Sequence, residues 1–318
     1  MDSIEHKTLK LNGINMHVAE KGSGQVILFI HGFPELWYSW RHQILSLSQL
    51  GYRCVAPDLR GFGDTDVPQG VQNYTIFHIV GDLVALLDTV APDQMVFVVG
   101  HDWGAQVAWQ LSLYRPDKVK ALVNLSVAYS PRTATAKPVA VMRQAYGDDF
   151  YICKIQEPGV MEAEFAELGT KRVIEEFLAY TSRSPLSFQK GNLFGHPNDT
   201  EIVLPDWVTD EVIDYYTTKF TKTGFTGGFN YYRAINLNWE LNAPWTGCPV
   251  KVPTKFIVGD MDTVYYTLGA NKYINSPAFK KNVPLLEEVV VMKGVTHWIQ
   301  EEKPEEVTKY IYDFFQKF

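Results

Sequence analysis

Short apolar runs recur along the first 125 residues of the chain. They occupy positions 26–30, 53–56, 95–99 and 120–125. Such nearly continuous hydrophobicity is typical of parallel strands that crossover helices cover on both faces. Between the second and third runs, apolar side chains recur at spacings of three and four from Ile76 to Leu87, which predicts an amphipathic helix packed on the sheet. The pattern therefore predicts an α/β fold with a mostly parallel central sheet flanked by helices.

The strand pattern stops near residue 131 and resumes near residue 246. Between these points, helical segments at 162–180 and 209–218 are separated by a stretch rich in Gly, Pro, Ser and Asn at 182–205. Apolar runs return at 255–258 and 288–292, before a last helix with an apolar stripe. We predict one core, residues 1–130 and 246–318, interrupted by a helical cap domain at 131–245, which we call the insert. Near the N-terminus, Gly22-Ser23-Gly24 predicts a hairpin turn.

Composition narrows the partners and the compartment. The 318 residues are 46% hydrophobic and carry a formal net charge of −7, which argues against nucleic acid or an anionic membrane as a partner. No apolar run approaches the roughly 18 residues of a membrane-spanning helix, and the N-terminus lacks the apolar core of a signal peptide. The cysteines Cys54, Cys153 and Cys248 have no zinc or redox spacing. We expect a cytoplasmic protein with reduced thiols and no membrane anchor.

The third apolar run leads into Gly100-His101-Asp102-Trp103-Gly104. This arrangement predicts a nucleophile elbow, in which a sharp strand-to-helix turn holds the central side chain at the top of the sheet. Here the central residue is Asp102. A carboxylate can displace a leaving group from saturated carbon and form an alkyl ester, whereas a serine would form an acyl ester. The alternative is that Asp102 only caps the following helix.

Two further segments would complete this chemistry. His31-Gly32-Phe33-Pro34 follows the first core strand, where α/β-hydrolases carry one oxyanion donor, and the other lies on the residue after the nucleophile. The predicted donors are therefore the backbone N–H groups of Phe33 and Trp103. We expect His31 and His101, which lie inside these motifs, to line the site.

His297, just beyond the last apolar run, is the candidate base. Because triads of this fold run nucleophile, acid, histidine, the acid should follow an intervening strand, where Gly259-Asp260-Met261-Asp262 offers two aspartates. We choose Asp262, because Asp260 is nearer the strand end and better placed for turn bonds. No metal-binding motif such as His-Glu-x-x-His occurs, so we expect neither a metal nor another cofactor.

A strained cyclic ether would need a proton donor for its departing oxygen, and a phenol can serve. The tyrosines in and beside the insert are the candidates, and the residue pattern alone does not choose among Tyr129, Tyr146, Tyr151, Tyr180, Tyr215, Tyr216, Tyr231 and Tyr232.

At these motifs the chain resembles the soluble epoxide hydrolases of the α/β-hydrolase fold, most closely the plant enzymes. The matching stretches, quoted by their positions, are 31–35 with Trp37 and Trp40, 58–63, 100–104, 150–151, 230–233, 259–262 and 294–298. The resemblance implies that Asp102 is the nucleophile and that His297 paired with Asp262 is the base. It also implies that Tyr151 and Tyr232 hold the epoxide oxygen, with Tyr232, directly before Arg233, as the acid.

The resulting prediction is a cofactor-independent enzyme that converts an epoxide and water into a vicinal diol. The resemblance suggests fatty-acid epoxides and aryl or alkyl oxiranes as substrates. Glu35 is a candidate for placing the water, and Trp37 for lining the pocket. The alternative is a haloalkane or haloacid dehalogenase with the same aspartate nucleophile, although haloalkane dehalogenases tend to carry Asn where Phe33 stands. A third possibility is a ligand-binding relative that has lost turnover.

Overall fold

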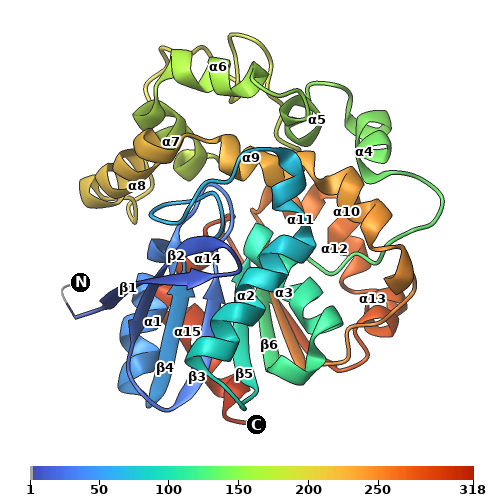
Figure 1. Cartoon of the computed structure of the whole chain (residues 1–318). Helices are drawn as coiled ribbons and strands as arrows, with labels where there is room; N and C mark the ends of the chain where they lie inside the picture. Colours follow the sequence, from blue (N-terminus) through green and yellow to red (C-terminus); the bar gives the residue numbers. More distant parts are fainter. Residues whose placement is uncertain (1–2) are drawn as a thin grey trace.

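The computed structural model describes residues 3–318, which form one eight-stranded sheet with helices on both faces and across one end (Figure 1). The strand order is β1-β2-β4-β3-β5-β6-β7-β8. β1 pairs antiparallel with β2, and β2 with β4, whereas all other neighbours are parallel. The strands are β1 Glu5–Leu11, β2 Ile14–Lys21, β3 Gln25–Ile30, β4 Tyr52–Pro57, β5 Val96–His101, β6 Val119–Leu125, β7 Thr254–Gly259 and β8 Leu286–Met292.

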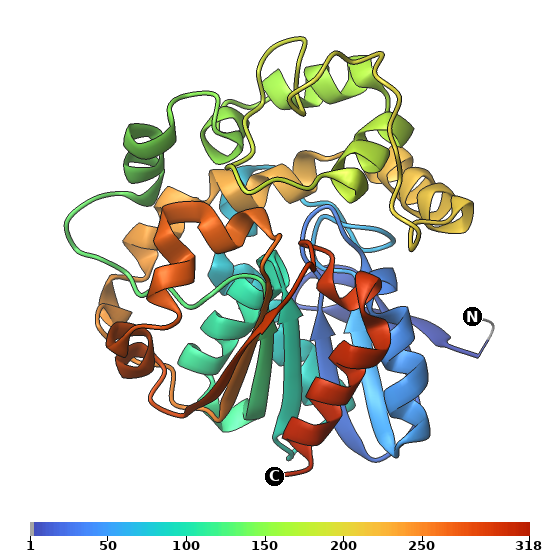
Figure 2. The same cartoon turned by 180° about the vertical axis from the view of Figure 1, so that it is seen from behind.

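The longer core helices cover the two faces of this sheet. α2 and α3 lie on the face that Figure 1 presents, and α1 and α15 lie on the face seen in Figure 2. Their bounds, with those of the shorter core helices, are α1 Arg41–Gln49, α2 Ile76–Val90, α3 Trp103–Tyr114, α11 Thr263–Tyr266, α12 Ala270–Tyr273, α13 Pro277–Asn282, α14 Ile299–Glu302 and α15 Pro304–Phe315. Short 3₁₀ turns lie at Trp37–Trp40, Val71–Tyr74, Pro116–Lys118, Ala243–Trp245 and Thr267–Gly269.

The predicted α/β class is confirmed, and the six apolar runs correspond to β3, β4, β5, β6, β7 and β8. The predicted hairpin at residues 22–24 is wrong. The hairpin turn is Asn12-Gly13, both at positive φ, which joins β1 to β2. Gly22 to Gly24 instead connects β2 to β3, and these strands are not neighbours because β4 lies between them.

The insert consists of helices and loops that lie across the carboxyl end of the parallel strands (Figure 1). The helical segment expected at 162–180 is two helices, broken at Gly169, which has a φ of 88°. The insert helices are α4 Pro138–Tyr146, α5 Tyr151–Ile155, α6 Val160–Leu168, α7 Thr170–Ala179, α8 Asp210–Thr223, α9 Thr226–Arg233 and α10 Ile235–Leu241.

Close backbone approach and buried hydrogen bonds hold the insert against the core. A Cβ atom at Gly227 in α9 would lie 2.2 Å from the carbonyl oxygen of Gly61, so only glycine fits there. The hydroxyl of Tyr231 donates to the Arg60 carbonyl at 2.9 Å, and the indole N–H of Trp298 donates to the Phe177 carbonyl at 3.1 Å. These contacts place α7 and α9 directly above the strand ends. Among residues 3–318, no helix is both long and apolar enough to cross a bilayer.

Candidate active site

The elbow between β5 and α3 holds Asp102 in a strained backbone conformation, with φ 52° and ψ −120°. Two glycines make room for it. A Cβ atom at Gly104 would lie 2.0 Å from the Ile30 carbonyl oxygen, and one at Gly32 would lie 2.5 Å from Asp102 Oδ1. The Asp102 side chain makes no capping hydrogen bond to α3. The carboxylate is therefore free to face the cavity above the sheet, and the capping alternative finds no support.

One predicted oxyanion donor already contacts the carboxylate. The backbone N–H of Phe33 donates to Asp102 Oδ1 at 2.8 Å. Trp103 is the first residue of α3, where a backbone N–H has no partner within the helix. Burial raises the pKa of Asp102 above its usual value, although the nearby His297 and His101 oppose that effect.

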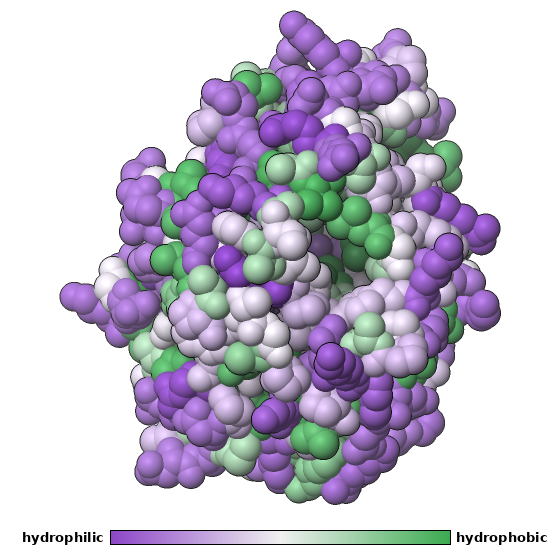
Figure 3. Space-filling model, turned by 90° about the vertical axis from the view of Figure 1, so that its right-hand side faces the viewer, coloured by the Kyte–Doolittle hydropathy of each residue, from purple (hydrophilic) through white to green (hydrophobic). Residues whose placement is uncertain are grey.

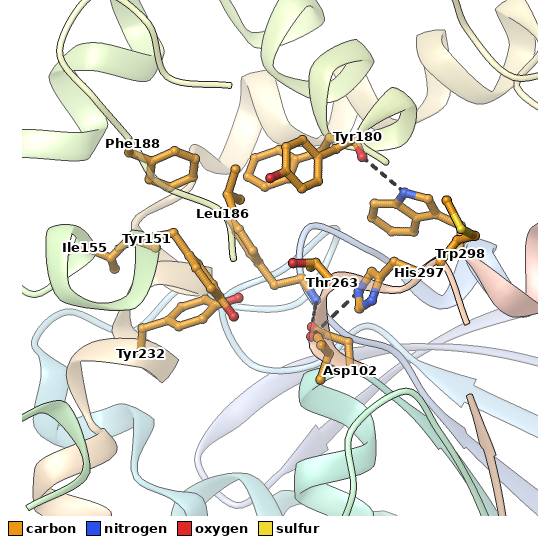
Figure 4. A pocket seen from close by; sticks show the side chains of 14 residues that line it. Asp102, Tyr151, Ile155, Tyr180, Leu186, Phe188, Tyr232, Thr263, His297 and Trp298 are labelled. Atoms are coloured by element: carbon orange, nitrogen blue, oxygen red, sulfur yellow. Dashed lines mark hydrogen bonds and ion pairs between the residues drawn. The ribbon is translucent and has the colours of Figure 1, made fainter. Parts of the chain in front are cut away.

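His297 lies between two carboxylates. Its Nδ1 is 3.0 Å from Asp262 Oδ1. Its Nε2 is 3.8 Å from Asp102 Oδ2 (Figure 4). Burial alone would lower the pKa of His297, but the negative charges and hydrogen bond around it outweigh that effect and raise it to about 9. Imidazolium is therefore the favoured form of His297 while both carboxylates are ionised.

The two aspartates of the 259–262 segment differ in their surroundings. Asp262 is fully buried and accepts hydrogen bonds from Ser126 Oγ at 2.6 Å and from the Val264 N–H at 2.9 Å, besides its contact with His297. Burial would raise its pKa, but these partners lower it below the usual value. Asp260 instead accepts from the Gly294 N–H at 2.6 Å, a bond within the strand-end turns. Asp262 is the one of the two that meets His297.

Two insert tyrosines face Asp102 across the cavity. Tyr151 begins α5 and Tyr232 lies near the end of α9, and their ring centroids are 5.7 Å apart. Figure 4 shows both hydroxyls pointing toward the space above Asp102. Burial, together with the charge of Asp102, raises the pKa of both phenols, so they stay protonated at neutral pH.

The other candidate tyrosines have different surroundings. Tyr180 lines the same cavity. The hydroxyls of the remaining tyrosines are engaged elsewhere: Tyr129 with the Cys248 carbonyl, Tyr146 with the Leu268 N–H, Tyr215 with the Trp37 indole, Tyr216 with Glu301, and Tyr231 with the Arg60 carbonyl.

The cavity between the sheet and the insert contains about 630 Å³ of empty space, including its open mouth. Its lining combines Asp102, His297 and the two tyrosines with apolar side chains, among them Phe33, Ile155, Phe177, Leu186, Phe188 and Trp298. Figure 3 shows a hollow on one side of the molecule, with hydrophobic residues inside it and along its upper edge. The site therefore suits an apolar molecule that brings one reactive polar group to Asp102.

Glu35 and His101 form a buried polar cluster behind His297. His101 Nδ1 hydrogen bonds to Glu35 Oε1, and its Nε2 donates to the His297 carbonyl at 2.8 Å. Glu35 Oε2 accepts from Ser39 Oγ at 2.8 Å and from Gln300 Nε2 at 3.2 Å. Burial would raise the pKa of Glu35, but His101 and His297 lower it. Glu35 is therefore a buried, hydrogen-bonded carboxylate near the candidate base His297, and not a solvated surface residue.

Contrary to expectation, the structure does not place His101, His31 or Trp37 in the lining of the cavity: His101 lies behind His297, and the other two contact the surrounding loops and helices. His31 Nδ1 donates to the Gly32 carbonyl at 2.8 Å, and its Nε2 accepts from the Leu59 N–H at 2.9 Å. Both ring nitrogens are therefore hydrogen bonded to backbone groups. The Trp37 indole donates to Tyr215 at 2.7 Å, between the core and α8. Both residues therefore hold loops in place. Sequence analysis missed Ser126, whose only signal is its position directly after a buried strand.

Two clusters among the described residues have ligand atoms close enough to share a metal ion: Glu35 with His101 and His297, and His17 with Asp58 and Asp64. The nitrogens of His101 are both hydrogen bonded, and Nδ1 of His297 is bound to Asp262. His17 Nδ1 is bound to Asp58 at 2.8 Å, and Asp64 forms ion pairs with Lys219 and Lys222. Metal binding at either cluster would have to break these contacts.

Comparison with known proteins gives the same fold class, an α/β hydrolase, as the strand order and the nucleophile elbow indicate. The family model of the alpha/beta hydrolase fold matches residues 25–153. The chain is 58% identical to epoxide hydrolase 1 of Siraitia grosvenorii over the full length of both, and 36% identical to epoxide hydrolase A of Mycobacterium tuberculosis over 99% of this chain and 98% of the relative.

Solved structures agree. Potato (Solanum tuberosum) epoxide hydrolase I superimposes with a TM-score of 0.96 at 55% identity, covering 99% of this chain and 100% of that one. The Vigna radiata epoxide hydrolase gives a TM-score of 0.96 at 54% identity, covering 100% and 99%. The chain therefore belongs to the epoxide hydrolases of the α/β-hydrolase fold, which confirms the resemblance seen in its motifs, and the dehalogenase alternative is not favoured.

Proposed function

We propose that this enzyme opens its epoxide with Asp102 and hydrolyses the resulting ester with water activated by His297, using residues 131–245 as a cap over the site. In the first step, a carboxylate oxygen of Asp102 attacks one epoxide carbon, and the C–O bond at that carbon breaks. The ring oxygen takes a proton from Tyr232, while Tyr151 donates a second hydrogen bond. The product is a hydroxyalkyl ester on Asp102.

In the second step, His297 removes a proton from a water molecule, which attacks the carbonyl carbon of the ester. The N–H groups of Phe33 and Trp103 stabilise the oxyanion. Its collapse passes the hydroxyl proton to the departing alkoxide oxygen, which releases the diol and restores the Asp102 carboxylate, and a proton from His297 returns Tyr232 to its phenol form. Glu35, through His101, places the water. Asp262 holds the Nδ1–H of His297, so that Nε2 faces the water.

The charges favour this order of events. In the resting site, burial lowers the pKa of His297, but the nearby carboxylates raise it to about 9. Asp262 has the larger effect, and the negative charge of Asp102 adds to it. Esterification removes the charge of Asp102. The pKa of His297 then falls, which makes it a base in the step that needs one.

The observation that carries this proposal is the pair of phenols opposite Asp102, half-buried Tyr151 and buried Tyr232 (Figure 4). A halide leaving group requires no proton, whereas an epoxide oxygen does. Phe33 stands where haloalkane dehalogenases tend to carry Asn, and its side chain gives a halide no donor. Both features favour the epoxide.

We propose apolar oxiranes as substrates, such as fatty-acid epoxides and aryl or alkyl oxiranes, because most side chains around the cavity are apolar. We also propose catalysis without a metal or other cofactor, because the residue chemistry above is complete without one. The three free cysteines, Cys54, Cys153 and Cys248, support a reducing, cytoplasmic location.

The test is to trap the ester. In H297Q, a terminal aryl epoxide should add its own mass to the protein, and peptide mapping should place the adduct on Asp102. H196Q, altered at a residue in the 182–205 loop, should turn over normally and show no accumulation. A haloalkane should leave no adduct on H297Q. Failure of H297Q and of the wild type to form any ester would refute the mechanism.

A further inference from the structure

Ser126, directly after β6, has an unusual backbone conformation. Its φ is 71°, in the left-handed region that side chains with a Cβ atom rarely adopt. Its N–H donates to the Ile257 carbonyl of β7 at 2.9 Å, and the residue is 2% exposed. Strain of this kind persists only where the surroundings hold it, and it concentrates at functional sites.

The strained backbone directs the Ser126 hydroxyl into the His297–Asp262 pair. Oγ donates to Asp262 Oδ2 at 2.6 Å and lies 3.2 Å from His297 Nδ1. The other carboxylate oxygen, Oδ1, accepts from Val264 and faces His297. Each oxygen of Asp262 therefore has its own donors, and Ser126 is the partner of Oδ2.

We propose that Ser126 is a positioning residue that fixes the plane of the Asp262 carboxylate and limits how strongly Asp262 holds the proton of His297. The proposal rests on the function proposed above. The carboxylate could otherwise rotate about its Cβ–Cγ bond, and Oδ1 would then leave the line of the Nδ1–H. A hydrogen bond to one oxygen also draws negative charge away from the other.

Four ionisable groups surround His297 from separate elements: Asp102 at the elbow, Asp262 after β7, Glu35 after β3, and His101 in β5, whose ring centroid is 4.7 Å away. Of these, Asp262 contacts the Nδ1–H. Loss of the Ser126 donor would concentrate charge on Asp262 Oδ1 and raise the pKa of His297. The hydroxyl oxygen is also near Nδ1, but Nδ1 carries a hydrogen in both forms of the ring, so that contact affects the pKa less.

The test compares S126A, S126G and S126T. Alanine keeps the Cβ atom and the strain but removes the hydroxyl, glycine removes both, and threonine keeps the hydroxyl. We expect ester hydrolysis at neutral pH to fall about tenfold in both S126A and S126G, from the loss of one hydrogen bond to a charged group. The midpoint of its pH profile should move upward in both, while alkylation of Asp102 changes less than threefold. S126T should restore the profile.

A second measurement does not depend on turnover. The ¹⁵N shifts of the His297 imidazole, followed through a pH titration of the resting enzyme, should give a higher pKa in S126A and S126G than in the wild type. An unchanged pKa and profile in both variants would overturn the proposal, as would a shift in S126G alone, which would assign the effect to the backbone. If the wild type never forms an ester, the proposed function fails, and the titration still decides the role of Ser126.

Discussion

Removal of the two cavity phenols separates the two chemical steps. Tyr151 and Tyr232 reach the same point above Asp102 from different helices (Figure 4). Replacement by phenylalanine keeps the ring packing and removes one donor. Because most side chains around the cavity are apolar, a water molecule in place of the lost hydroxyl would have few other hydrogen-bond partners there.

The expected loss of alkylation rate follows from the negative charge that develops on the epoxide oxygen, to which each hydroxyl donates. A hydrogen bond to a charged group is worth about 1.5–3 kcal/mol, which corresponds to a roughly 10- to 150-fold slower alkylation for Y151F or Y232F alone. The double variant leaves a developing alkoxide in an apolar cavity with neither phenol to donate to it. Its loss should therefore exceed the product of the single losses.

Rapid mixing with excess epoxide, acid quenching and intact mass analysis would give the alkylation rate directly. Hydrolysis of the preformed ester should change less than threefold, because that oxyanion faces the N–H of Phe33 and not the phenols. Y180F is the matched control, since Tyr180 lines the same cavity. The reasoning is refuted if the single variants slow ester hydrolysis while alkylation stays at the wild-type rate.

Three further changes test the remaining parts of the site. D262N keeps an oxygen for His297 Nδ1, and its amide can donate to Ser126, but the charge is lost. Ester hydrolysis should fall by about 10²–10⁴ and the ester should accumulate by mass. G32A brings a methyl group within 2.5 Å of Asp102 Oδ1, so alkylation should fall more than 100-fold by quench assay; a rate near the wild type would contradict the geometry. Single-turnover hydrolysis at pH 5–9 should rise with pH, because the base must be neutral, and its midpoint should lie below 9, since the ester lacks the charge of Asp102. A midpoint at or above 9 would argue against that charge effect.

The elements that a local pattern specifies could be predicted from the sequence. The inner strands are buried on both faces and read as continuous apolar runs, and the elbow is a contiguous motif. β1 was missed because most of its side chains are exposed and polar, Glu5, Lys7 and Lys10 among them, which leaves no apolar run. His31 and Trp37 show a different limit: membership of a motif does not determine where the side chain points.

The contacts that decide the chemistry join residues far apart in the chain. The choice of Tyr151 and Tyr232 depends on how α5 and α9 pack above the sheet, which the resemblance supplied and the spacing did not. Ser126 meets Asp262 because β6 and β7 are parallel neighbours whose carboxyl ends lie side by side. The residue types in the sequence therefore identify candidate site residues. The packing of the helices and the order of the strands determine which of these candidates contact one another.

The two carboxylates of the site show why this selection matters. Asp102 and Asp262 are both buried aspartates, yet the pKa of the first is raised and that of the second is lowered. Burial acts on both in the same direction, so the difference comes from their partners: one N–H donor for Asp102, against Ser126, Val264 and His297 for Asp262. The carboxylate with few donors keeps the lone pairs that a nucleophile needs, and the one with many stays ionised to hold the base. Conversion of Asp102 into a neutral ester then leaves His297 with Asp262 as its direct carboxylate partner, and the base is released for water.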